Sequence, residues 1–67
     1  MTHNEYLKLQ DYVGAEALNN LMNMAQTMNI FEFMKQIQLI IVLNKELKFV
    51  IKTLKRLAIR FYNDMND

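Results

Sequence analysis

The sequence predicts an all-α protein: an antiparallel helical hairpin whose long second helix pairs with another copy of the chain to form a four-helix bundle. Three observations support this fold class. An apolar heptad pattern runs over residues 30–65, a capping signature precedes each predicted helix, and the chain has no Pro and a single Gly. With 67 residues, the chain is expected to be one helical domain over 1–67, with helices at about 3–27 and 30–63.

The first predicted helix starts after Thr2, which can act as the N-cap with Glu5 completing a capping box. Its apolar stripe is Tyr6, Leu9, Val13, Ala17, Leu21, Met24 and Met28. Gly14 interrupts this stripe at a cost of about 1 kcal/mol relative to Ala. It marks either a close helix crossing or a break in the helix near residues 11–14.

The second predicted helix starts after Asn29, with Glu32 in the capping-box position and Met28 placed to pack on Phe33. The link between the two helices is therefore only two or three residues long, which forces an antiparallel hairpin. The heptad seam of the second helix comprises Ile30, Phe33, Ile37, Ile40, Asn44, Leu47, Ile51, Leu54, Ala58, Phe61 and Met65. Because only Asn44 among these is polar, the seam is typical of a coiled-coil helix with partner helices.

Asn44 has two interpretations. In a continuous helix it is a buried polar residue at an a position, where Asn fixes register and oligomer state. As an N-cap it would instead break the helix into 30–43 and 45–63 and give a three-helix domain. Neither Gly nor Pro supports the break, so the continuous helix is the first prediction.

Oligomerisation is expected because a chain of this size can bury only about 60% of its unfolded surface. Neither disulfides nor a structural metal can compensate, since the chain has no Cys and its one His is His3. One partner helix also covers too little of the second helix, which is apolar nearly all round at residues 39–43. The predicted oligomer interface is Ile37, Ile40, Asn44, Leu47, Ile51, Leu54 and Phe61.

Catalysis is not expected, because the chain lacks Ser and Cys and its only His lies at the terminus. No carboxylates cluster with His at metal-ligand spacing, so neither a metal site nor a cofactor is predicted. Four methionines, Met22, Met24, Met28 and Met34, gather near the hairpin corner. They are interpreted as adaptable core packing rather than as ligands for a soft metal ion.

A basic stripe is the main polar feature of the predicted second helix. Its members are Lys45, Lys48, Lys52, Lys55, Arg56 and Arg60. Residues 1–34 carry one lysine against four acids, a net of −3, whereas residues 35–67 carry seven bases against three acids, a net of +4. The hairpin would partly neutralise the stripe by bringing Glu5 near Lys52. The stripe can contact nucleic-acid phosphates, an anionic membrane surface or acidic partners, although the overall net charge is only +1.

The function that the sequence favours is a small cytoplasmic protein-interaction module, such as an adaptor, inhibitor or regulator. It would act as a homodimer or higher oligomer and bind an unidentified protein. The alternative is a nucleic-acid-binding helical regulator that uses the basic stripe. A membrane partner is not expected, because the apolar run at 39–43 is far shorter than the roughly 20 residues of a membrane span and fits a bundle core better.

Overall fold

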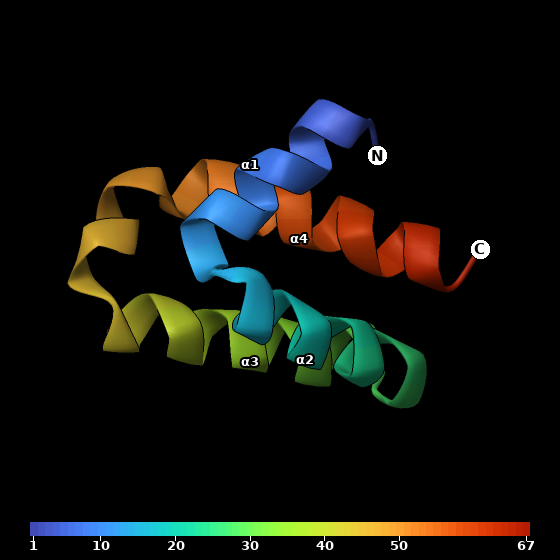
Figure 1. Cartoon of the computed structure of the whole chain (residues 1–67). Helices are drawn as coiled ribbons and strands as arrows, with labels where there is room; N and C mark the ends of the chain where they lie inside the picture. The colour runs from blue at the N-terminus through green and yellow to red at the C-terminus, as the bar shows by residue number, and fades with distance from the viewer.

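The computed structural model describes all 67 residues and contains only helices, which confirms the all-α class (Figure 1). The elements in chain order are α1 (His3–Val13), α2 (Ala15–Thr27), α3 (Ile30–Leu43), the 3-10 helix η1 (Lys45–Val50) and α4 (Ile51–Met65). Helices α2 and α3 run antiparallel, and α4 returns alongside α3 after the chain reverses through η1. Helix α1 packs on α4, and both termini lie at the end of the molecule opposite η1 (Figure 1).

Both predicted helix starts are confirmed by their caps. The Thr2 hydroxyl accepts a hydrogen bond from the backbone N–H of Glu5 at 3.1 Å, and the Glu5 carboxylate accepts one from the backbone N–H of Thr2 at 2.9 Å. At α3, the Asn29 side chain accepts from the backbone N–H of Glu32 at 2.9 Å. The Glu32 carboxylate does not complete the second box, and instead contacts Lys35 at 3.5 Å.

The predicted continuous helix over 3–27 is wrong, and the alternative break near residues 11–14 is what the structure shows, at Gly14. This residue has φ +91° and ψ 155°, a conformation that residues with a Cβ rarely adopt. Its N–H still donates to the carbonyl of Gln10 at 2.7 Å, and its carbonyl accepts from Leu18 N–H at 3.0 Å. Gly14 therefore ends α1 and starts α2 with few lost backbone hydrogen bonds, while turning the chain in a new direction.

The predicted continuous helix over 30–63 is also wrong, and the alternative break at Asn44 is what the structure shows. The Asn44 N–H donates to the carbonyl of Ile40 at 3.0 Å, which ends α3. The Asn44 side-chain oxygen accepts from Glu46 N–H at 3.2 Å, and its carbonyl accepts from Leu47 N–H at 3.0 Å, which starts η1. One residue thus caps two helices, and the reversal lets both halves of the seam bury their apolar faces within one chain.

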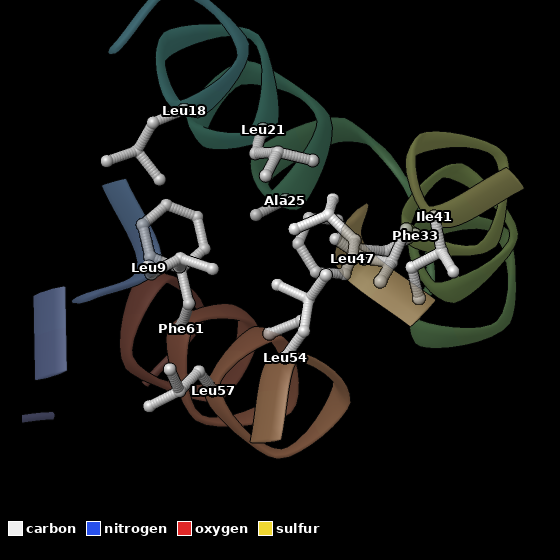
Figure 2. Packing of buried hydrophobic residues seen from close by; sticks show 12 residues of the cluster. Leu9, Leu18, Leu21, Ala25, Phe33, Ile41, Leu47, Leu54, Leu57 and Phe61 are labelled. Carbon is white, nitrogen blue, oxygen red and sulfur yellow. The ribbon is translucent and has the colours of Figure 1, made fainter. Parts of the chain in front are cut away.

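A core of twelve buried side chains lies between the α2–α3 pair and the α1–α4 pair (Figure 2). They are Leu9, Leu18, Leu21, Ala25, Phe33, Ile37, Ile41, Leu47, Leu54, Leu57, Ala58 and Phe61. The ring of Phe33 stacks on Phe61, with centroids 6.4 Å apart and planes 16° from parallel. No polar or charged residue is buried, so hydrophobic packing holds the helices together without a buried polar network.

Candidate interaction surfaces

The residues predicted as an oligomer interface lie mainly inside the single chain. Ile37, Leu47, Leu54 and Phe61 are buried core residues, Ile40 and Ile51 are half-buried, and only Asn44 is exposed. The prediction failed for the four core residues because the break at Asn44 folds the two halves of the seam onto each other. Partner helices from the same chain therefore cover the seam.

A different apolar surface remains uncovered on the outward face of α3. We call it the α3 outer face and define it by Phe31, Leu39 and Val42. The exposed fractions of these residues are 77%, 52% and 58%. Their helical spacing places them opposite the buried Phe33 and Ile37, with Lys35 as the one charged residue of the stripe.

The α3 outer face adjoins a shallow groove of about 230 Å³ between α2 and α3. The lining residues are Ala17, Asn20, Leu21, Met24, Gln36, Leu39, Ile40 and Leu43. No charged side chain occurs in α2 after Glu16 or in α3 after Lys35. The groove therefore has an apolar floor and a neutral rim of amide side chains.

The predicted basic stripe is divided between η1 and α4. Arg60, and not Lys52 as expected, forms an ion pair with Glu5 of α1. None of the other five cations has a carboxylate oxygen within 4.0 Å; they are Lys45, Lys48, Lys52, Lys55 and Arg56. The structure thus leaves most of the stripe free for an anionic ligand.

The Glu5 carboxyl has its pKa lowered by its contacts in the fold. The hydrogen bond from the backbone N–H of Thr2 lowers the pKa of Glu5 below its ordinary 4.5, although desolvation acts in the opposite direction. The hydrogen bond and the positive charge of Arg60 lower it further. This carboxylate caps α1 and joins it to α4, so its charge has a structural role.

The corner formed by the end of α3 and by η1 carries the two most exposed large apolar side chains. Leu43 is 85% exposed and Phe49 is 92% exposed. Phe49 borders an open hollow of about 400 Å³ whose other lining residues are Lys48, Val50, Ile51, Lys52 and Thr53. Lysines and exposed apolar groups therefore occur together at this end of the molecule.

The predicted oligomer interface did not include Phe31, Leu39, Val42 or Phe49, although the sequence carries a signal for a second contact surface. In the heptad frame of the a/d seam these residues occupy b, c and f positions, which face away from the seam. Bulky apolar residues at such positions indicate a second contact surface, and the structure leaves all four exposed.

No group of three or more His, Asp or Glu residues is placed to hold a metal ion. Met22, Met24 and Met34 pack against the core, in agreement with their interpretation as packing residues. None of the helices combines the length and the apolar character needed to cross a bilayer.

The fold and its surfaces define a small all-helical protein with exposed apolar faces. Comparison of the chain with protein-family models, with curated proteins and with solved structures gave no match.

Proposed function

We propose that the protein is a non-enzymatic interaction module that works as a homodimer through the α3 outer face and the adjoining groove. The observation that carries this proposal is the exposure of Phe31, Leu39 and Val42 on one side of a helix whose other side is fully packed. Exposed apolar surface of this kind, interrupted here by Lys35, marks protein interfaces. The assembled dimer would then present its remaining surface to a further protein partner in the cytoplasm.

The charge distribution supports a second copy as the partner on this face. A two-fold interface brings each residue near its own counterpart or near the opposite end of the same patch, so charges at its centre would repel one another. The stretch 36–44 is free of charge. Interface centres are generally depleted of charged residues, as this stretch is.

The charged residues at the two ends of α3 favour an antiparallel arrangement of the paired helices. Glu32 and Lys35 lie near the start of α3, and Lys45 and Glu46 directly follow its end. Antiparallel pairing of two copies would bring Glu32 of one chain toward Lys45 of the other, and Lys35 toward Glu46. Parallel pairing would place each charge near its like counterpart.

Light scattering across a dilution series tests this proposal. The wild-type chain, of 8.0 kDa, is expected to show twice that mass at high concentration and to dissociate on dilution. Leu39→Glu should shift the protein to the monomer while its far-UV circular dichroism stays helical, because Leu39 is half-exposed. Asn63→Glu, which adds the same charge at an exposed position of α4, is the matched control and should leave the dimer intact. A wild-type monomer at all concentrations would refute the proposal.

Nucleic-acid binding through the basic stripe is the second candidate, supported by the five cations that have no ion-pair partner. Binding to duplex DNA or to RNA should then weaken steeply as salt concentration rises. Replacing Lys52 and Lys55 by Glu should abolish it. No binding at low salt would exclude this candidate, and the result does not depend on the dimer.

A further inference from the structure

The corner between α3 and α4 carries both exposed apolar side chains and positively charged lysines. Leu43 is the last residue of α3, and Phe49 lies in η1, which is only six residues long. At about 2 Å rise per residue, η1 spans roughly 12 Å, so both side chains belong to one end of the molecule. Figure 1 shows this gold segment at the edge of the fold, away from both termini.

Lys48 and Lys52 line the same hollow as Phe49, and Lys45 follows Leu43 by two residues, with little negative charge nearby in the sequence. Between Phe33 and Asn63 the chain has seven basic residues and one acid, Glu46. Lys45, Lys48 and Lys52 are exposed, and none pairs with a carboxylate. Their long apolar stems can lie along an apolar phase while the ammonium groups reach anions at its surface.

The chemistry of the corner favours lipid over nucleic acid as the partner. A nucleic acid would use the Phe49 ring for base stacking and the lysines for phosphates, but it would have no use for an aliphatic Leu43. The boundary region of a bilayer takes up both Leu and Phe, and anionic headgroups complement the lysines. The sequence did not favour a membrane partner because residues 39–43 were expected in a bundle core, whereas the structure leaves Leu43 outside the core.

We propose that this corner binds the surface of an anionic membrane, with Leu43 and Phe49 inserted at the boundary between headgroups and acyl chains and with Lys45, Lys48 and Lys52 contacting the headgroups. This contact is peripheral. Phe49 lies outside the α3 outer face and its groove, so its insertion does not depend on dimerisation, whereas Leu43 also lines one part of the groove.

The chain has no Trp, so a single introduced indole reports its own surroundings. Phe49→Trp tests the corner, and Leu7→Trp is the matched control, since Leu7 is 43% exposed on α1, outside both the corner and the α3 outer face. Each variant is mixed with phosphatidylcholine vesicles, with or without about 30 mol% phosphatidylserine. We expect the emission of the Phe49→Trp variant to shift to the blue only with phosphatidylserine, and that of the Leu7→Trp variant to stay unchanged. No shift for Phe49→Trp, or equal shifts for both variants, would overturn the proposal.

Co-sedimentation with the same vesicles measures separately how the inserted apolar groups and the lysine charges contribute to vesicle binding. Leu43→Ala and Phe49→Ala should each weaken vesicle binding about fivefold or more, because each removes an inserted apolar group. Leu7→Ala should not, and Lys48→Glu with Lys52→Glu should abolish binding. All these residues except Leu7 lie at the corner and all are exposed, so circular dichroism should confirm unchanged folding.

Binding of a single-stranded oligonucleotide tests nucleic acid as the alternative ligand of the corner. The membrane proposal would be overturned if the protein bound the oligonucleotide and did not bind vesicles. The corner would then be assigned to nucleic acid if Phe49→Ala abolished oligonucleotide binding and Leu43→Ala did not. Monomeric wild-type protein that still binds phosphatidylserine vesicles would refute the dimer and leave the membrane proposal supported.

Discussion

The rings of Phe33 and Tyr62 lie 5.2 Å apart, centroid to centroid, although the two residues belong to the first turn of α3 and the last turns of α4. In a continuous helix, residues 33 and 62 would be about 43 Å apart. The Tyr62 hydroxyl also donates to the carbonyl of Met28 at 2.7 Å, which fixes the end of α4 on the α2–α3 turn. These contacts exist because the chain reverses after Asn44.

Removing a seam side chain should destabilise each chain rather than separate two chains. Leu54 is fully buried, so Leu54→Ala should lower the free energy of unfolding by about 2–5 kcal/mol. Leu39→Ala, on the half-exposed α3 outer face, should change the unfolding of the monomer far less. Urea denaturation of dilute protein, with circular dichroism as the readout, compares the two. Equal losses would show that Leu39 is as well packed as Leu54.

A side chain at position 14 should cost stability through the backbone alone. A Cβ built on Gly14 meets no atom within 4 Å, yet the φ of +91° disfavours any L residue. Gly14→Ala should therefore destabilise the fold by about 1–3 kcal/mol. D-alanine at the same position, introduced by chemical synthesis, favours positive φ and should be neutral or stabilising. A stabilising L-alanine would instead indicate that α1 and α2 form one helix.

Loss of the side chain of Asn44 should weaken the reversal between α3 and η1. Asn44→Ala removes the acceptor for Glu46 N–H and is expected to lower the free energy of unfolding by about 1 kcal/mol. Asn29→Ala removes the comparable cap of α3 and should cost a similar amount. Thermal unfolding measures both variants. If the Asn44→Ala variant were more stable than the wild type and had a larger hydrodynamic radius, the continuous helix would be close in free energy to the compact fold.

The charge of Glu5 should make folding stability depend on pH. Because folding lowers the pKa of Glu5, its contribution is present above the ordinary value of 4.5 and is lost as the pH falls through the lowered value. Glu5→Gln should thus lower the thermal midpoint at pH 7, and the difference from wild type should shrink on acidification. Arg60→Gln should reduce this pH-dependent part without removing it, because the Thr2 N–H is the largest cause. A difference that does not vary with pH would contradict the role of this charge.

Local signals in the sequence were enough to predict the helical class and both capped starts. The heptad seam also identified core residues correctly, since Phe33, Ile37, Leu47, Leu54 and Phe61 are all buried. The seam did not reveal which helices would cover it. A regular a/d pattern can be buried by another chain or by the same chain folded back, and the pattern is identical in both cases.

The two breaks depend on tertiary contacts more than on local preference. Asn44 fits an a position of a coiled coil as well as it fits a helix cap, so the sequence alone left both open. Burial of α4 against α1 and α3 favours the cap. The exposed α3 outer face was not predicted, because Leu39 and Val42 were expected to be covered within a larger bundle.

An isotope-filtered nuclear Overhauser experiment tests most directly whether the chain folds on itself at Asn44 and pairs through the α3 outer face. The sample is an equal mixture of labelled and unlabelled protein at a concentration where light scattering shows the dimer. We expect the Phe33–Tyr62 contact to arise only within a chain, while the methyl groups of Leu39 and Val42 show contacts between chains. A Phe33–Tyr62 contact between chains would contradict the fold, because it would mean that long helices exchange their halves. The absence of any contact between chains at Leu39 and Val42 would contradict the proposed interface.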